Sequence, residues 1–587
     1  MRVFAAVLLS MSIAALPLLA SDAKEAGKEE TVAAVSSVPA AAEKPREAAP
    51  LGASENKEAA KPEGSAIESE MQDLRSLVEE QRAELEAQRA ALKAQQIKMD
   101  ALVEKLIPGP AEPSSAAAAA PAAASTAITA NSTVATSPAV SSSPAAMPSP
   151  QADQDSPLQL RIGSAYLTPV GFMDFTTVYR SHDLGSGIGT NFGNIPIGNA
   201  AANHLSEWRQ SMQNSRIGFR FDASVMGAHV LGYMESDYLG NNAGSVAVTS
   251  NSNTLRSRLY WLDVRKGQWE VLGGQTWSLI TPGRTGISPL PGNIFYSQDI
   301  DVNYQLGLVW GRIPELRFVY HPTDKVAFAI ALDQQEQYVG GSGGGPNPTF
   351  PAALSSLSGS QLNNASNTLS TPNVAPDLIV KLAFDPSSKF HAEVGGVERQ
   401  FKIWNPNTNV TFQNTGAGGF VNLNFELFKG FRILTNNFWS DGGGRYIFGV
   451  VPDLILRADG SISPIHTGST VSGFEFTHKN TLLYTYFGGI YVSRNIAVDA
   501  NGTTPIGYGY GAATGGSQNR FLQEETVGFN QTIWKDPKWG AINVMAQYSY
   551  EQRNPWSFVG AGARSAHVNQ VYGDLRYTLP GSAPAIK

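Results

Sequence analysis

The sequence contains no cysteine. Disulfide bonds, thiolate metal sites, a cysteine nucleophile and a lipid anchor on an N-terminal cysteine are therefore excluded. Charged residues are also scarce, at 16% of 587 residues, whereas an average soluble domain has about 25%. Beyond residue 20, no run of about 18 consecutive apolar residues occurs. We therefore predict no membrane-spanning helix in the mature chain.

Charge is divided unevenly along the chain, whose formal net charge is -7. Residues 1–156 carry 13 Lys and Arg against 21 Asp and Glu, and the rest of the chain carries 30 against 29. The larger part is nearly neutral and lacks the overall positive field that captures nucleic acid. We expect no nucleic-acid partner, and any charge selectivity must come from the placement of individual side chains.

The N-terminal region has three segments of unusual composition. Residues 1–20 combine a basic start, a short apolar run and small residues at its end, which predicts a secretory signal peptide. A membrane anchor helix is the alternative for this segment. Residues 21–64 are rich in Ala, Glu, Lys and Pro, and we predict a disordered polar segment there. Residues 108–157 form an Ala/Ser/Pro-rich linker.

Residues 65–107 carry a heptad pattern. Six consecutive heptads run between Ile67 and Leu106, with apolar residues at one seam position throughout. This 3.5-residue period favours a self-associating coiled coil, because a lone helix would leave its apolar stripe in water. Gln81, Gln88 and Gln95 share the other seam position, where they would set the register of the coiled coil or the number of its helices. A single charged helix acting as a spacer is the alternative.

Residues 158–587 follow a period of two. In 214–222, 377–385 and 541–551, apolar side chains alternate with polar, charged or small ones. These segments are about 9–15 residues long, as a tilted strand needs to cross a bilayer, whereas strands of soluble sandwiches have about 5–6 residues. Backbone groups in lipid must all be paired, so the sheet must close. The predicted fold class is an all-β transmembrane barrel.

Connections of two lengths alternate along this region. Seven short turns and eight long Gly/Asn/Ser-rich stretches predict about 16 antiparallel strands, an even number as in bacterial outer-membrane barrels. Because the first connection is long, both ends of the barrel lie on the short-turn side, which places the coiled coil in the periplasm. The short turns are expected near 226–227, 266–267, 321–325, 385–388, 429–430, 478–480 and 535–538, and the long stretches at 181–212, 239–253, 278–303, 334–375, 401–414, 441–470, 495–520 and 552–562.

About sixteen strands enclose a lumen that side chains cannot fill, so we expect an aqueous channel. The long stretch Ser278–Asn303 is rich in Gly and Pro, carries Arg284, Asp299 and Asp301, and is a candidate to fold inward and narrow this channel. Aromatic residues near strand ends are expected to form two interfacial girdles. They are Trp261, Trp269, Trp310, Tyr320, Trp439, Tyr491, Trp534, Trp539 and Trp556.

Charged side chains within the strands are predicted to face the lumen, because an arginine facing lipid costs about 2–4 kcal/mol at the midplane. Arginine stays charged at physiological pH and presents a planar fork to carboxylates, so a group of them would concentrate anions. An internal ion-pair network that braces the wall is the alternative. The candidate anion-binding residues are Arg216, Arg220, Arg256, Arg258, Arg284, Arg317 and Lys381, and the acidic ones in the lumen or constriction loop are Glu235, Asp237, Asp299 and Asp301.

The order of signal, heptads, tether and barrel resembles the DcaP-like trimeric outer-membrane porins. The segments 215–220, 256–260 and 274–278 (SRIGFR, RSRLY and GQTWS) carry the likeness. The resemblance implies a homotrimer in outer-membrane lipid that passes small, preferentially anionic organic solutes, such as dicarboxylates or aromatic carboxylates, down their gradient. One difference is that the chain continues past Tyr577 and Leu579, where such barrels usually finish on an aromatic residue.

Other functions have weaker support in the sequence. The eight histidines are scattered and no H-E-x-x-H motif occurs, so we expect neither a metal nor a cofactor. No nucleophile elbow lies in an α/β setting, and we expect no enzymatic activity. A specific sugar or phosphate channel is the alternative transport function. A barrel that chiefly tethers the envelope, with periplasmic or cell-wall contact through the coiled coil, is the alternative from another class.

Overall fold

The computed structural model describes residues 158–241, 251–294, 297–343, 345–365, 371–510, 518–556 and 565–580. The predicted signal peptide, polar segment, coiled coil and linker lie outside the described residues, so those four assignments stay predictions. No helix in the described ranges is long and apolar enough to cross a membrane.

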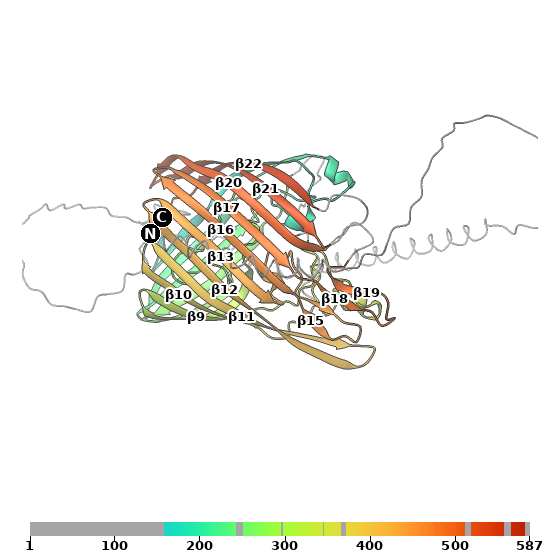
Figure 1. Ribbon diagram of the computed structural model, residues 1–587. Helices are drawn as coiled ribbons and strands as arrows, with labels where there is room; N and C mark the ends of the chain where they lie inside the picture. Colours follow the sequence, from blue (N-terminus) through green and yellow to red (C-terminus); the bar gives the residue numbers. More distant parts are fainter. Residues whose placement is uncertain are drawn as a thin grey trace, which may run out of the picture. The chain divides into compact units, whose positions relative to one another are not determined.

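One antiparallel sheet closes into a barrel (Figure 1). The sheet has eighteen strands, of which β1 and β3 are short pieces beside β2, so that sixteen strands form the wall. β2 pairs with β22 on one side and with β3 and β4 on the other, which closes the ring. The predicted closed barrel of about sixteen antiparallel strands is confirmed.

The wall strands are β2 (Ala165–Arg180), β4 (Arg216–Val225), β5 (Ala228–Asp237), β6 (Arg256–Lys266), β7 (Trp269–Trp277), β8 (Arg312–Thr323), β9 (Val326–Asp333), β10 (Asp377–Ser387), β11 (Phe390–Asn405), β12 (Val410–Phe428), β13 (Phe431–Asp441), β16 (His466–His478), β17 (Thr481–Val492), β20 (Asn519–Asp536), β21 (Gly540–Pro555) and β22 (Ala566–Thr578). The remaining strands are β1 (Leu160–Ile162), β3 (Glu207–Ser211), β14 (Leu454–Leu456), β15 (Ile462–Pro464), β18 (Asn495–Val498) and β19 (Pro505–Tyr508). Short 3-10 helices span Phe192–Asn194, Ala201–His204, Pro291–Asn293, Ala352–Leu357 and Gly444–Tyr446.

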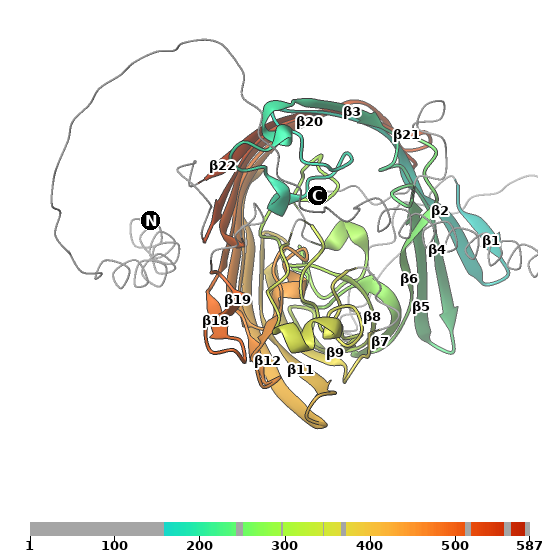
Figure 2. The ribbon, with the colours of Figure 1, turned by 90° about the vertical axis from the view of Figure 1, so that its right-hand side faces the viewer.

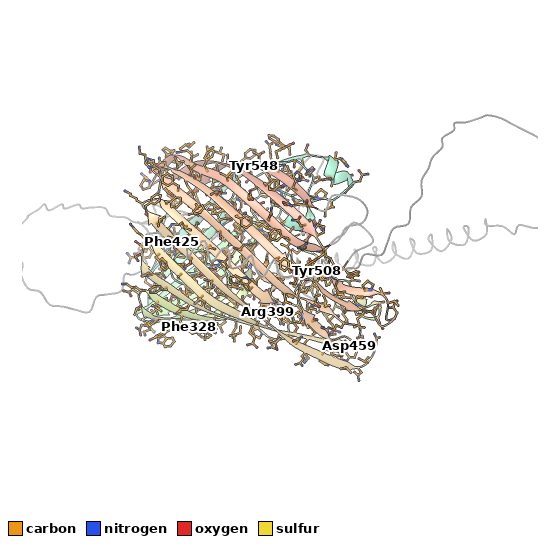
Figure 3. All side chains as sticks on the ribbon, viewed as in Figure 1. Phe328, Arg399, Phe425, Asp459, Tyr508 and Tyr548 are labelled. Atoms are coloured by element: carbon orange, nitrogen blue, oxygen red, sulfur yellow. The ribbon has the colours of Figure 1, made fainter. Side chains whose placement is uncertain are left out.

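The alternating sequence gives the wall an apolar outer face and a mixed inner face. In β9, Phe328 and Ile330 are 41% and 37% exposed, whereas Ala329 and Ala331 between and beside them are fully buried. Phe328 and Tyr548, labelled in Figure 3, belong to the outer face, and Tyr548 is 41% exposed. Successive side chains of a strand point to opposite faces, so lipid contacts one set and the interior the other.

Short turns join the strands at one end of the barrel and long connections join them at the other. All seven short turns form where the sequence predicts them, from β4–β5 to β20–β21. β2 begins and β22 ends at the short-turn end, since Ala165 pairs with Ala223 near one turn and Thr578 pairs with Ala541 near another. The predicted placement of both barrel ends is therefore confirmed.

Two expectations about loops and aromatics need correction. The stretch 401–414 is not a loop, because β11 and β12 continue through it as a hairpin paired from Phe390 with Phe425 to Asn405 with Val410.

Trp261 and Trp310 do not join an interfacial girdle: the Trp261 ring stacks on Tyr233 and the Trp310 ring packs against Trp277. In the outer face Trp269, Trp439, Trp534 and Trp539 are exposed, as predicted.

Candidate functional site: the pore constriction

The described parts of the connection between β7 and β8, residues 278–294 and 297–311, lie inside the barrel; we call them the inward loop. Its backbone donates hydrogen bonds to side chains of distant wall strands: Gly283 N to Glu393 on β11 (3.1 Å), Ile300 N to Gln547 on β21 (2.7 Å) and Leu306 N to Glu524 on β20 (2.8 Å). Figure 2, viewed along the barrel, shows green segments crossing its interior. The prediction that this stretch folds inward is confirmed, and the inward loop extends beyond the expected 278–303.

Small residues on the wall make room for the inward loop. Leu279, Ile280 and Ile287 belong to one buried apolar cluster with Ala329 of β9 and Ile379 of β10. Because β9 has alanines on its inner face, the loop's larger side chains fill the space beside that wall. The loop therefore rests against the wall through packing as well as through hydrogen bonds.

Arg284 ties the inward loop to β16. Its Nη2 lies 2.7 Å from Glu475 Oε1 and its Nη1 donates to Oε2 at 3.1 Å, so the pair is bidentate. The Tyr486 hydroxyl on β17 donates to Glu475 Oε1 at 2.7 Å. Both charged side chains are nearly buried, at 9% and 2% exposure. Arg284, predicted as an anion-binding residue, is thus placed in the loop and already holds a carboxylate.

Three arginines and two carboxylates gather on the inner face of β4, β5 and β6. Arg258 donates from Nε to Glu235 (2.9 Å) and from Nη1 to Asp237 (2.6 Å). Arg216 lies 3.5 Å from Glu235, and Arg256 donates to Asp237 at 2.9 Å. The structure therefore brings these five predicted residues together, across three neighbouring strands.

The other predicted cations also lie next to carboxylates. Arg220 forms a bidentate pair with Asp222 on its own strand, at 2.9 and 3.0 Å. The two remaining cations, Arg317 and Lys381, are buried against acidic residues of the wall: Arg317 pairs with Glu315, and Lys381 Nζ lies 3.2 Å from Glu393 Oε1. Their predicted inward orientation holds, and the contacts are those of a wall-bracing network. An anion-binding role for each stays a prediction.

Arg317 and Lys381 also support the inward loop. Arg317 Nη2 donates to the carbonyl oxygen of Trp277 at 2.8 Å, and Lys381 Nζ donates to the carbonyl oxygen of Thr281 at 2.7 Å. Both side chains are almost fully buried, at 2% and 3% exposure. These two cations therefore fix the point where the loop leaves β7.

Asp299 and Asp301 lie in the inward loop and face the wall. Asp301 accepts hydrogen bonds from the Tyr572 hydroxyl (2.9 Å) and the Thr190 backbone (3.2 Å). Asp299 accepts one from the Ser297 hydroxyl at 2.5 Å. Burial, and then the neighbouring Glu524 carboxylate, hold the pKa of Asp299 well above its usual value. Asp301 therefore anchors the loop to β22, whereas the hydrogen bond of Asp299 is made within the loop.

A group of aromatic and cationic side chains lies where β22 pairs with β2, and it was not predicted from the sequence. The guanidinium carbons of Arg216 and Arg576 lie 4.9 and 4.4 Å from the centroid of the Phe172 ring of β2. Arg576 on β22 pairs with Asp174 at 2.6 Å and with Asp574 at 3.0 Å. The alternation of Asp574 and Arg576 in the last strand is a signal that could have shown their common inner face.

Arg399 is another residue that was not predicted. It is fully buried at the long-loop end and pairs with Asp377 at 3.0 Å and with Asp453 at 2.7 Å (Figure 3). Asp453 belongs to the connection between β13 and β16. Because each partner is buried too, this triad holds that connection over the barrel interior and is a structural element.

In several of these pairs the guanidinium is the more exposed partner. Exposure is 39% for Arg256 against 0% for Asp237, 22% for Arg576 against 0% for Asp174, and 11% for Arg216 against 6% for Glu235. In these three pairs the carboxylate is the more deeply buried partner, so water meets the guanidinium first. In the Arg220–Asp222 and Arg258–Glu235 pairs the carboxylate is slightly the more exposed partner. Among the described residues no group of three or more His, Asp or Glu side chains is arranged to hold a metal ion.

Comparisons with known proteins address the fold alone. No protein-family model matches the sequence, and no curated protein matches it. The crystal structure of the outer-membrane channel DcaP of Acinetobacter baumannii is similar, with 17% identity, a TM-score of 0.50, and coverage of 71% of this chain and 98% of that one. The anion-selective porin of Comamonas acidovorans follows with 11% identity, a TM-score of 0.40, and coverage of 70% and 99%. The chain therefore has the fold of the DcaP channel, a closed antiparallel β-barrel.

Proposed function

We propose that the protein is a passive porin for small, preferentially anionic organic solutes such as dicarboxylates or aromatic carboxylates. A sixteen-stranded barrel is wide enough to leave an aqueous path beside packed side chains. The inward loop narrows that path, since its backbone is tied to β11, β20 and β21 on distant parts of the wall. A barrel narrowed in this way sorts solutes by size and charge.

The observation that carries the anion preference is the exposure of guanidinium groups over buried carboxylates. Arg216, Arg256 and Arg576 present charge to the interior, while Asp237 and Asp174 behind them are fully buried. Ions in the narrow part of the path meet these cations at close range, where the low dielectric of the wall strengthens the interaction. Each guanidinium is already paired, so a solute is held weakly and can leave.

The fold that the chain shares with the DcaP channel supports a channel rather than an enzyme. We extend the proposal to a homotrimer in outer-membrane lipid, as the resemblance implies. Chemical cross-linking or native mass measurement of the detergent-solubilised protein tests this. Three subunits per particle are expected, and a stable monomer would contradict the trimer.

Swelling of proteoliposomes in isotonic solutes tests the transport function. Succinate should enter faster than a neutral solute of similar size, and a tricarboxylate should enter more slowly than succinate because of its bulk. Faster entry of the neutral solute would contradict the anion preference. Absence of any swelling would contradict the channel itself.

The same assay separates the channel from the alternative functions. A barrel lacking residues 21–150 should swell liposomes as the full chain does, because the wall and the inward loop lie outside that segment. A specific sugar or phosphate channel would show a strong preference for one of those solutes. An envelope tether would show no solute entry, and would lose its role when 21–150 are removed.

A further inference from the structure

The two ends of the inward loop meet in a cluster of aromatic rings. Trp277 ends β7, Trp310 precedes β8, and the loop closes between them through Ser278 N to Gly311 O at 2.9 Å. Ring centroids of Trp277 and Trp310 lie 5.6 Å apart, and Tyr304 of the loop lies 5.9 and 5.4 Å from the two indoles. Each pair is arranged edge to face, the geometry that aromatic rings prefer.

Arg312 extends into this aromatic cluster. Its guanidinium carbon lies 5.6 Å from the centroid of each indole, those of Trp277 and Trp310. Unlike the cations described above, Arg312 forms no ion pair with any described residue. Its Nη1 and the Trp310 Nε1 are buried donors that find no acceptor within the described ranges. Buried donors without an acceptor are uncommon in folded proteins, and they suit a site that takes a ligand.

The surroundings of Arg312 keep a net positive charge. Arg216, Arg256 and Arg258 share the carboxylates of Glu235 and Asp237, so that Arg312 adds a fourth guanidinium without a further carboxylate. The charged and titratable groups that act on Arg312 are Arg258 and Arg256, which repel it, and the Tyr304 hydroxyl and Asp237, which attract it. These four guanidinium groups outnumber the two carboxylates by two, so the cluster attracts an additional anion.

Tyr304 reports the same positive field. Burial alone would raise the pKa of its hydroxyl, yet the pKa is lowered, because Arg258, Arg216 and Arg312 favour the phenolate. Arg258 Nη2 donates to the Tyr304 hydroxyl oxygen at 3.3 Å. The Tyr304 backbone has a φ of 64°, a conformation that a bulky residue adopts at a cost, so the loop holds the ring in place by its packing.

We propose that Arg312 and Trp310, backed by the buried Trp277, form a binding site for planar aromatic carboxylates where the inward loop joins β8. This site rests on the proposed function as an anion channel and specifies the solute that it prefers. The carboxylate accepts hydrogen bonds from Arg312 and from the Trp310 indole N–H, and the solute ring packs against the Trp310 indole, because Trp277 is buried behind it. Arg312 and Trp310 are both partly exposed, so the solute enters from that side.

The preference for an aromatic ring follows from the two kinds of contact. A carboxylate is the anion whose geometry fits a planar guanidinium, and it gains strength from a charged donor. A flat ring gains additional contact with an indole that a puckered ring of the same size does not. Arg256, whose side chain is 39% exposed, raises the local concentration of anions near the site.

Benzoate and cyclohexanecarboxylate test the site, because they have the same charge and nearly the same size. Their apparent dissociation constants are measured by block of the chloride current through the reconstituted protein, and by calorimetry on the detergent-solubilised protein. Benzoate should bind more tightly, by about threefold, as expected for one aromatic contact. Equal binding of the two acids would overturn the aromatic part of the proposal.

Variants locate the site. Arg312→Gln should weaken benzoate binding about tenfold, and Arg312→Lys should weaken it less because the charge remains. Trp310→Leu should remove the preference for benzoate, and Trp310→Phe should keep part of it. Arg457→Gln, an exposed arginine in the connection between β13 and β16, is the matched control and should change neither constant. If Arg312→Gln and Arg312→Lys bind benzoate as the wild type does, the site is refuted.

The two readouts keep this proposal separate from the proposed function. An anion-selective current with equal benzoate and cyclohexanecarboxylate binding contradicts the site alone. Absence of any current contradicts the channel, while calorimetry in detergent still decides whether Arg312 and Trp310 bind benzoate. Each variant is also run on a denaturing gel without heating, where a band at the position of the folded wild type shows that the barrel has formed.

Discussion

Gly488 on β17 lies directly against Leu306 of the inward loop: a Cβ atom at position 488 would stand 1.9 Å from the Leu306 carbonyl oxygen. No real Cβ atom approaches an oxygen so closely, and the obstructing atom belongs to the backbone. The absence of a side chain at position 488 therefore leaves the space on β17 that the backbone of the inward loop occupies. The next residue, Gly489, has only side-chain atoms nearby, the nearest at 3.6 Å.

Gly488→Ala should push the inward loop away from β17 and weaken the hydrogen bond from Leu306 N to Glu524. We expect a loss of stability of about 1–3 kcal/mol, typical of overpacking, and a larger or noisier single-channel current. Thermal unfolding in detergent and bilayer recording measure the two effects. Gly489→Ala is the control and should do neither. Equal behaviour of the two variants would show that the loop is not seated on β17.

The pair Arg284–Glu475 should fasten the loop electrostatically. Replacing either partner alone by Gln leaves a nearly buried charge without its partner and should cost about 3–5 kcal/mol. The double replacement should cost less than the sum of the single ones, because no charge is left alone. A double-mutant cycle on unfolding in denaturant measures the coupling. Strict additivity would mean that the pair contributes nothing to holding the loop.

The direction of side chains in β8 predicts where a new charge is tolerated. Leu316 is 42% exposed on the outer face, next to the buried Arg317. Leu316→Arg should destabilise the barrel by about 2–4 kcal/mol if the site lies near the bilayer midplane. Leu427→Arg, two residues before the turn at Lys429 and therefore near the interface, should cost about 0–1 kcal/mol. Folding titrations in lipid measure both, and equal costs would contradict the assigned membrane depth.

The raised pKa of Asp299 makes the seating of the loop depend on pH. The folded state holds this proton more tightly than the unfolded state, so stability is highest below the ordinary value of 3.8 and falls as pH rises through the raised pKa. Asp299→Asn should stabilise the protein at neutral pH and reduce this dependence. Thermal unfolding at acidic and neutral pH measures it, and Asp324→Asn in an exposed turn is the control. A stability that depends on pH equally in the wild type and in both variants would contradict the assignment.

The period-two pattern was sufficient to predict the fold and the direction of most side chains. Arg317 and Leu316 lie on opposite faces because neighbouring residues of a strand must do so. The same pattern placed Arg216, Arg220 and Lys381 inside. The turn positions followed from short polar interruptions between apolar runs, and both barrel ends followed from the order of short and long connections.

Partnerships across the barrel could not be read from one sequence. Arg576 pairs with Asp174, 402 residues away, because β22 returns to β2 in a particular register. The hairpin of β11 and β12 was also missed, since its extension has the polar composition of a loop. The sequence neighbours of Trp310 suggest a strand end at the interface, while its real position depends on the fold of the inward loop. These features depend on contacts between distant segments.

The zero-current potential of the reconstituted protein in a potassium chloride gradient tests the central claim most directly. Guanidinium groups exposed over buried carboxylates predict a potential displaced towards the equilibrium potential of chloride. Arg256→Gln, which removes the most exposed of these cations, should displace it back towards zero. A potential on the potassium side that Arg256→Gln leaves unchanged would contradict the account.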